Sequence, residues 1–220
     1  MTHTAPSSHD PSVVSLTPSQ EVAVAKLAAG IAKPGTITVL CGPQGVGKTT
    51  VVAALARSER QRGRTVAIHD LNDWHSASTE ALPEIVIAES AHRADDGDLR
   101  TLLAACRRRS PKASLLLVGE GRLLTILARD GAVEQAVHLR ASLRPCSVEE
   151  SRHILTAQPA RDAMASDAVT ATMHEIAAGI PAAMLRLADL AAVVAEARPG
   201  TLLTTADIEA IHARLSPLAA

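Results

Sequence analysis

A glycine-rich segment of eight residues constrains this chain more than any other feature. Residues 42–49 read Gly-Pro-Gln-Gly-Val-Gly-Lys-Thr and match the pattern G-x-x-x-x-G-K-[ST] at every fixed position. Glycines at these places let successive backbone N–H groups turn inward around phosphate oxygens. A helix that begins where the motif ends directs its positive pole to the same point. The segment therefore predicts a P-loop between a β-strand and an α-helix.

The residues on both sides of the loop have the patterns that a P-loop requires. Thr36 to Cys41 is short, apolar and β-branched and predicts a strand, while Lys48 to about Arg62 predicts a helix that Gly63 ends. Lys48 would reach the β- and γ-phosphates of a nucleoside triphosphate, and the hydroxyl of Thr49 would coordinate Mg²⁺. We expect ATP and Mg²⁺ as ligands. The predicted nucleotide-binding residues are Gly42, Pro43, Gln44, Gly45, Val46, Gly47, Lys48, Thr49 and Thr50.

Strands and helices alternate along most of the chain. Further strands are predicted at 65–69, 84–88 and 114–119, with a fifth at 137–140, and a helix is predicted at 99–109. This alternation is typical of an α/β fold with a parallel sheet. The apolar run at 114–119 suits a strand that is buried on both faces.

A helix is also predicted before the first strand, from Pro18 to about Ala32. Thr17 and Gln20 have the spacing of a capping box at its start. Val22, Leu27 and Ile31 are expected on its buried side.

After Pro145 the pattern changes to helices only. Ser147 and Glu150 predict a second capping box, and further helices are expected at 167–178, 181–197 and 205–215. We therefore predict three regions. They are a disordered N-terminal segment at 1–16, a P-loop α/β domain at 17–145 and a helical domain at 146–220.

The third predicted strand ends in Glu89-Ser90-Ala91-His92. P-loop ATPases carry at this place an acid that holds Mg²⁺, often followed by an acid that activates the attacking water. We expect Glu89 to share the Mg²⁺ ion with Thr49, and Ser90 to stand where the water-activating acid would be. In the alternative alignment Ala88-Glu89 fills the two acidic positions, so that Glu89 is the catalytic acid.

The composition limits the kinds of partner. The chain is 47% hydrophobic with a net charge of −1, so no overall field draws it to nucleic acid or to an anionic membrane. Phe and Tyr are absent, which removes most aromatic platforms for single-stranded bases. One dense basic run, Arg107-Arg108-Arg109 with Lys112, fits a solvated helix end. A nucleic-acid partner is therefore only weakly supported.

The cysteines and the apolar segments bear on location. The three cysteines have unrelated spacings that fit neither a disulfide framework nor a metal site, which favours the reducing cytoplasm. The first 18 residues lack the basic start and apolar core of a signal peptide. The apolar stretch 181–197 contains three charged residues, which excludes a membrane span. The sequence predicts a cytoplasmic chain without a transmembrane segment.

Five segments in order resemble the ExeA/GspA-like AAA+ ATPases, the general secretion pathway protein A family. They are Leu16–Glu21 followed by the P-loop, Glu89–His92 for D-E-A-[QH], Leu116–Glu120 for the L-V-G-Q strand, Leu143–Glu150 for L-R-P-L-S-x-E-E, and Ala178–Asp189 for G-G-I-P-R-x-x-N-x-L-A-D. The resemblance implies strand order 5-1-4-3-2 and a helical lid over the nucleotide. It also places Glu120 at the end of the strand that supplies the first sensor residue, so Glu120 joins Glu89 and Ser90 as a candidate catalytic residue.

The chain departs from the family where hydrolysis is concerned. Ser90 replaces the second acid, and Ala182 and Ala136 stand where the family has arginines. We therefore expect an ATP-dependent switch or assembly factor that hydrolyses slowly and acts through a nucleotide-dependent homo-oligomer or a protein partner. The alternatives are a non-hydrolysing ATP-binding module, a DNA-associated ATPase of the transposition-helper type and a small-molecule kinase.

Overall fold

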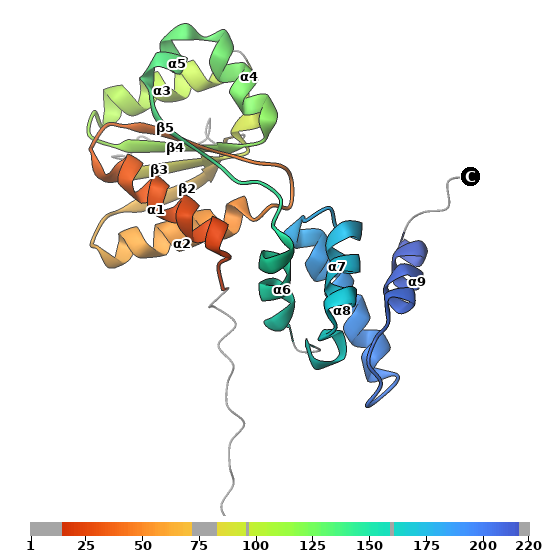
Figure 1. Cartoon of the computed structure of the whole chain (residues 1–220). Coiled ribbons are helices and arrows are strands. Elements are labelled where there is room, and N and C mark those ends of the chain that lie inside the picture. The colour runs from red at the N-terminus through yellow and green to blue at the C-terminus, as the bar shows by residue number, and fades with distance from the viewer. Residues whose placement is uncertain (1–14, 72–82, 96, 159–160, 216–220) are drawn as a thin grey trace, which may run out of the picture.

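Five strands form one parallel sheet in the computed structural model, which describes residues 15–71, 83–95, 97–158 and 161–215 (Figure 1). The sheet order is β2-β3-β4-β1-β5, and every neighbouring pair is parallel. The predicted order 5-1-4-3-2 and the α/β P-loop fold are confirmed. The strands are β1 (Ile37–Cys41), β2 (Val66–Asp70), β3 (Ile85–Glu89), β4 (Ser114–Gly119) and β5 (Val137–Ser142), so β2 and β3 lie one residue later than expected.

The central strands are apolar because helices cover both faces of the sheet. Alternate residues of one strand enter two separate clusters. Leu40 packs with α1 (Pro18–Ala32) and α2 (Lys48–Gln61), whereas Val39 packs with the helices of the opposite face. That face is covered by η2 (Ala91–Arg93), α3 (Asp98–Arg109), α4 (Gly121–Arg129) and α5 (Gly131–Ala136).

Helices α4 and α5 were not predicted. Each begins with a glycine, and they have only nine and six residues, too few for a clear helical period. Asp130 lies between the two helices. Its side chain accepts hydrogen bonds from the N–H groups of Ala132 and Val133 and so caps α5.

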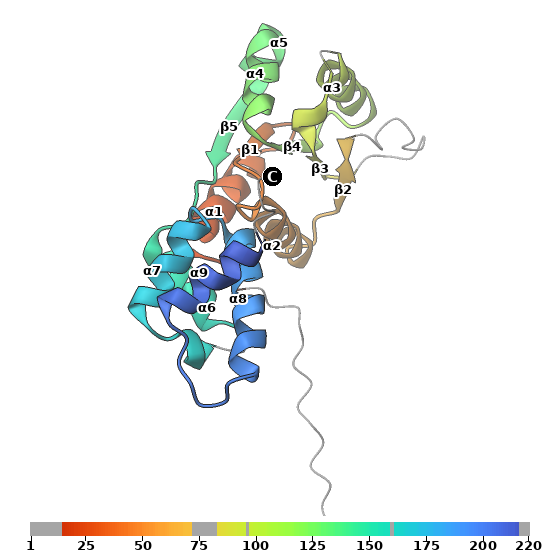
Figure 2. The ribbon, with the colours of Figure 1, turned by 90° about the vertical axis from the view of Figure 1, so that its right-hand side faces the viewer.

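A second group of helices, the helical part, follows β5. It contains α6 (Val148–Thr156), η3 (Arg161–Met164), α7 (Asp167–Ile176), α8 (Pro181–Glu196) and α9 (Thr205–Leu215). These helices enclose a separate core of methionine and aliphatic side chains that includes Met173, Met184 and Ile208. Figures 1 and 2 show the group on the side of the sheet where the strands have their carboxyl ends. No helix in the described ranges is long and apolar enough to cross a membrane.

The separate core of the helical part is formed by residues after 145, and the domain boundaries stay a prediction. The predicted disordered segment, 1–16, lies outside the described residues up to residue 14. Both capping boxes are present. Thr17 and Gln20 close the first, and Ser147 and Glu150 close the second.

The expectation that Val22 is buried is wrong, because its side chain is 54% exposed. The buried face of α1 instead runs through Gln20, Ala23, Leu27, Gly30 and Ile31. Val22 precedes Ala23 and lies about 100° round the helix from it, which turns Val22 toward solvent.

Truncation of α1 side chains tests which face is buried. We expect Leu27→Ala to lower the free energy of unfolding by about 2–5 kcal/mol, because Leu27 is fully buried and a cavity would remain. Val22→Ala, on the exposed face, should change it by less than about 0.5 kcal/mol. Urea unfolding of both variants measures the difference, and similar losses would contradict the assigned face.

Candidate functional site

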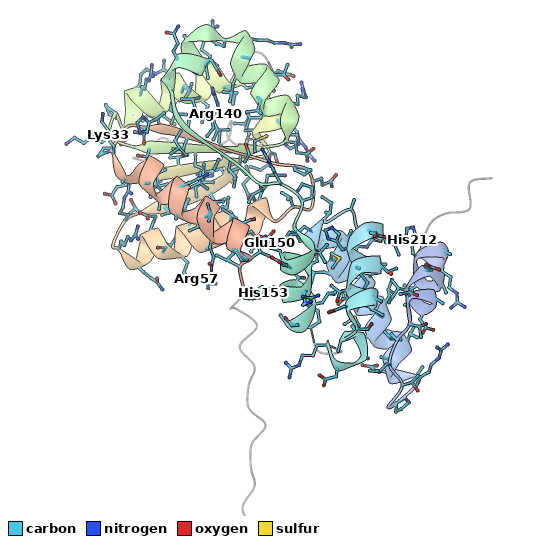
Figure 3. All side chains as sticks on the ribbon, viewed as in Figure 1. Lys33, Arg57, Arg140, Glu150, His153 and His212 are labelled. Atoms are coloured by element: carbon cyan, nitrogen blue, oxygen red, sulfur yellow. The ribbon has the colours of Figure 1, made fainter. Side chains whose placement is uncertain are left out.

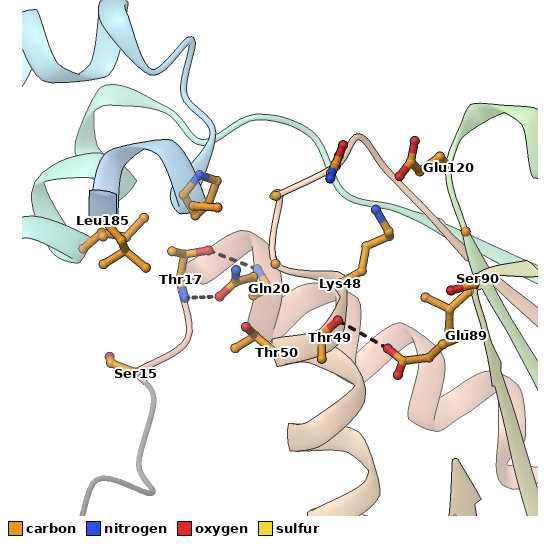
Figure 4. A pocket seen from close by; sticks show the side chains of 18 of the residues that line it. Ser15, Thr17, Gln20, Lys48, Thr49, Thr50, Glu89, Ser90, Glu120 and Leu185 are labelled. Atoms are coloured by element: carbon orange, nitrogen blue, oxygen red, sulfur yellow. Dashed lines mark hydrogen bonds between the residues drawn. The ribbon is translucent and has the colours of Figure 1, made fainter. Parts of the chain in front are cut away.

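A cavity of about 770 Å³ lies where the carboxyl ends of the strands meet the helical part (Figure 4). Its volume falls in the range of small-molecule sites. The α/β part contributes chiefly Gln20, Gly45, Lys48, Thr49, Asp70, Glu89, Ser90, His92, Arg93 and Glu120. The helical part contributes His153, Ile154, Ala157, Gln158, Pro181, Ala182 and Leu185.

The glycine-rich loop has the backbone that its sequence predicts. Gly45 and Gly47 have φ values of +76° and +97°, in the left-handed region that glycine enters without steric cost. The N–H of Gly42 donates to the carbonyl of Gly119 at 3.3 Å, which joins the start of the loop to β4. Helix α2 begins at Lys48, so its free N–H groups face the cavity. The loop can therefore receive an anion.

Lys48 supplies the positive charge at the loop. Its Nζ donates to the carbonyl oxygens of Gly42 at 2.9 Å and Pro43 at 2.8 Å. Burial lowers the pKa of Lys48, while the negative charge of Glu120 and the Cys41 thiol group oppose that shift. An incoming phosphate group would replace the two carbonyl oxygens as the partner of the ammonium.

Thr49 and Glu89 lie together, as a shared Mg²⁺ site requires. The hydroxyl of Thr49 donates to Oε1 of Glu89 at 3.3 Å (Figure 4). A hydroxyl and a carboxylate are hard oxygen ligands of the type that Mg²⁺ prefers. Within the described residues no group of three or more His, Cys, Asp or Glu side chains could hold a metal ion. These two residues therefore fit an ion that takes its remaining ligands from phosphate and water.

Asp70 is a second acid at the site that sequence reasoning missed. It follows the predicted strand 65–69, is paired with Glu89 in the register of β2 and β3, and accepts a 2.6 Å hydrogen bond from the hydroxyl of Ser90. Ser90 itself has a left-handed backbone, with φ of 56°. The signal was available, because the carboxyl ends of parallel strands meet at one edge of a sheet.

Glu120 and His92 form another pair in the cavity wall. Nε2 of His92 lies 3.7 Å from Oε1 of Glu120, which occupies the N-cap position of α4. The Nδ1 atom of His92 is buried and has no hydrogen-bond partner among the described residues. Arg93, which follows on η2, adds a cation that the sequence patterns did not indicate. The structure thus brings Glu89, Ser90 and Glu120 to one cavity.

The helical part meets the loop directly. The N–H of Ala182, at the start of α8, donates to the carbonyl of Gly45 at 3.1 Å. A Cβ on Gly45 would lie 2.9 Å from the side chain of Ile180, so only glycine permits this approach. Ile154, Ala157 and Leu185 give the helical side of the cavity an apolar surface. The cavity therefore combines a polar, phosphate-sized end with an apolar end.

Comparison of the sequence with models of known protein families also indicates a nucleotide-binding domain. The family model described as "CobQ/CobB/MinD/ParA nucleotide binding domain" matches residues 37–216. No curated protein matches the sequence.

Solved structures of AAA+ ATPases have a similar fold. The Holliday junction branch migration motor RuvB of Thermotoga maritima is 17% identical, with a TM-score of 0.62 over 90% of this chain and 68% of that chain. The ORC2 protein of Aeropyrum pernix, in ADPNP-ADP complexes, is 15% identical, with a TM-score of 0.61 over 94% of this chain and 71% of that chain. Hsp104 of S. cerevisiae, in a casein complex, is 17% identical, with a TM-score of 0.67 over 92% of this chain and 42% of that chain. Identities this low show the fold alone.

Substitution of Gly47 tests how tightly the loop is packed. We expect Gly47→Ala to lower the free energy of unfolding by about 1–3 kcal/mol, because its φ is left-handed and the new Cβ would meet the side-chain amide of Gln20. Gly121→Ala is the control, since Gly121 has no positive φ and no atom near its Cβ position. It should be neutral or slightly stabilising by urea unfolding. Equal effects would mean that the loop does not need glycine at 47.

Proposed function

The chain belongs to the CobQ/CobB/MinD/ParA nucleotide binding domain family, and from that premise we propose that it is an ATP-binding molecular switch whose helical part responds to bound ATP and Mg²⁺. One observation carries the proposal. The hydroxyl of Thr49 and the carboxylate of Glu89 meet at 3.3 Å. With Lys48 on the same loop, this contact supports a Mg²⁺ site that would adjoin the phosphate site.

The phosphates are the part of the ligand that this loop recognises. The N–H groups of the loop and of the first turn of α2 would donate to the β- and γ-phosphates, and Lys48 would balance their charge. Thr49 and Glu89 would hold Mg²⁺ against the same oxygens. Thr50, which also lines the cavity, would face the remaining phosphate.

The nucleoside would lie toward the helical part. Ile154, Ala157 and Leu185 offer an apolar surface of the kind that a base needs, and no Phe or Tyr exists to stack on it. A nucleotide in this cavity would touch both parts of the chain at once. Because a ligand shifts an equilibrium toward the arrangement it binds better, ATP would favour closure of the helical part on the loop.

The resemblance to the general secretion pathway protein A family is retained as part of the proposal. Its segments 89–92 and 116–120 end in the cavity wall, and its segment 178–189 begins α8 against Gly45. The same resemblance favours self-association or a protein partner as the output of the switch. Buried thiols at Cys41, Cys106 and Cys146 suit the reducing cytoplasm.

Hydrolysis is proposed to be slow. Ser90 cannot accept a proton as a carboxylate does, and Ala182 carries no charge to stabilise a transferring phosphoryl group. Asp70 also lines the cavity and would be a further acid to orient a water molecule, but one of its oxygens already accepts the Ser90 hydroxyl. The site therefore favours holding ATP over turning it over.

Removal of the Lys48 ammonium tests binding. We expect Lys48→Ala to weaken Mg²⁺-ATP binding by about 2–5 kcal/mol, roughly 30-fold to several thousand-fold in Kd, because buried phosphate charge would lose its partner. Lys33→Ala removes the same charge at the C-cap of α1, far from the cavity, and should bind normally (Figure 3). Titration calorimetry gives both affinities.

The same titration in EDTA should lower the affinity of the unaltered chain for ATP by about tenfold or more. Thr49→Ala should abolish most of this dependence on Mg²⁺. ATP affinity that is independent of both Lys48 and Mg²⁺ would overturn the proposed function.

Turnover provides a separate test. We expect hydrolysis below about 0.01 per second, far under the roughly 1–100 per second of phosphoryl-transfer kinases. Asp70→Asn should reduce the remaining rate by about 10²-fold without changing ATP affinity, because it removes a carboxylate that would accept the proton of the attacking water. Asp189→Asn, on the exposed surface of α8, is the control. Rapid turnover that survives Asp70→Asn would show that another group activates the water.

A further inference from the structure

We propose that the first turn of α1 couples the P-loop to the helical part, with Gln20 positioning the loop and Glu150 fastening the same turn to α6. Neither residue carries reaction chemistry, so both are positioning residues. The inference rests on the proposed function, since it assigns regulation to the nucleotide site described above.

The side chain of Gln20 packs against the backbone of the P-loop at Val46 and Gly47. It is buried, with 6% of its surface exposed. Its Oε1 accepts a hydrogen bond from the N–H of Thr17 at 3.1 Å, and its Nε2 lies 3.5 Å from the carbonyl oxygen of Val46. The same Nε2 fills the space that a Cβ on Gly47 would need. The backbone of the loop at 46–47 therefore packs directly against the side chain of Gln20 (Figure 4).

The carboxylate of Glu150 bonds the first turn of α1 to the start of α6. Its Oε1 accepts from the N–H of Ser19 at 2.8 Å, and its Oε2 accepts from the N–H of Ser147 at 3.0 Å. One buried carboxylate thus satisfies free amides at the starts of two helices, α1 and α6, which belong to different parts of the chain (Figure 3). The N-terminus of each helix carries a partial positive charge, so the carboxylate of Glu150 attracts the N-termini of both α1 and α6.

The charge on Glu150 is favoured by these contacts. Burial alone would raise the pKa of Glu150. Hydrogen bonds from the hydroxyls of Ser19 and Thr17 and from the backbone N–H groups of Ser147 and Ser19 outweigh that effect, so the pKa lies below its usual value. The link between α1 and α6 is therefore made by an ionised group.

The two contacts are adjacent, since Ser19 and Gln20 are consecutive residues in one helical turn. A displacement of the loop at Gly47, as phosphates enter, reaches Gln20 directly and reaches α6 through Glu150. The loop is also tied to α8 at Gly45, through the N–H of Ala182. The P-loop is thus held by α1 on one side and by α8 on the other, and bound nucleotide acts on both.

Energetic coupling is established by a double-mutant cycle rather than by proximity. Gln20→Met keeps the length of the side chain but loses its hydrogen bonds. Glu150→Gln keeps an acceptor oxygen on one side of the carboxylate plane and places an NH₂ group on the other, so either Ser19 or Ser147 loses the oxygen that it now donates to. We expect each change to weaken Mg²⁺-ATP binding by about threefold to tenfold, the size of one hydrogen bond. The double variant should lose less than the product of the two factors.

The controls separate coupling from damage to the fold. Glu149→Gln removes the same charge from the exposed side of the same turn of α6 and should bind ATP normally. Gln20→Glu keeps the capping box, so it should restore the thermal stability lost in Gln20→Met without restoring ATP affinity. Full recovery of affinity in Gln20→Glu would overturn the role of the loop contact.

Hydrogen exchange gives the second readout. With a non-hydrolysable ATP analogue at saturation, the unaltered chain should gain protection in the P-loop, α6 and α8. Glu150→Gln should keep the protection of the P-loop and lose most of that in α6. Multiplicative affinity losses together with unaltered α6 protection would overturn this inference while ATP binding and its dependence on Lys48 stood. Failure of the unaltered chain to bind ATP would overturn the proposed function, and this inference with it.

Discussion

The close packing around the P-loop backbone is the constraint on which the rest of the structure depends. Three distant segments contact this loop through its glycines. Gly42 donates to β4, Gly45 accepts from α8 and Gly47 leaves room for the side chain of Gln20. A side chain at any of these positions would meet protein atoms less than 3.0 Å away. Gly45, which is not a fixed glycine of the motif, is therefore the residue that lets α8 of the helical part contact the loop, whereas Gly42 and Gly47 contact β4 and α1.

The parallel register explains why acidic groups gather opposite the loop. Asp70 and Glu89 end adjacent strands, and Glu120 follows the next strand along the sheet. Three carboxylates near one edge repel one another unless cations intervene. Lys48, Arg93 and a bound Mg²⁺ would supply that positive charge. If Mg²⁺ binds at Thr49 and Glu89 as proposed, the sheet topology would make the site depend on the metal as well as on the nucleotide.

Local patterns predicted the parts of the fold that local interactions determine. The capping boxes followed from short segments because their hydrogen bonds close within a few residues. The P-loop and the strands followed from glycine spacing and apolar runs, although each strand pairs with a distant segment of the chain. The outward position of Val22 did not follow, since the buried face of α1 is chosen by its packing on the sheet. The two short helices after β4 were also missed, because tertiary contacts rather than length stabilise them.

The residues of the candidate site likewise fall into those that sequence patterns predicted and those that only the structure revealed. Lys48, Thr49 and Glu89 belong to segments with a recognisable spacing, and the structure brings all three together. Asp70 belongs to no motif, and Gln20 was indicated only as a member of a capping box. Both enter the site because strand order and helix packing place them there. Asp70 was deducible from the predicted strand order, whereas the contact of Gln20 with the loop required the structure. Sequence patterns thus indicated Gln20 and Glu150 as capping residues, whereas their contacts with Val46 and Ser19 required the structure.

The proposed slow hydrolysis would change what the nucleotide can do. A turnover of about 0.01 per second leaves ATP in place for roughly 100 seconds. Movements of helices and domains take microseconds to milliseconds, so the chain reaches conformational equilibrium many times before the bond breaks. Over such a period ATP acts as a bound ligand rather than as a fuel. The effect on the helical part is then set by how much better ATP binds the closed arrangement than the open one. Under the proposal, a site that contacts both parts of the chain and carries Ser90 in place of the second acid would suit that role better than the role of a motor.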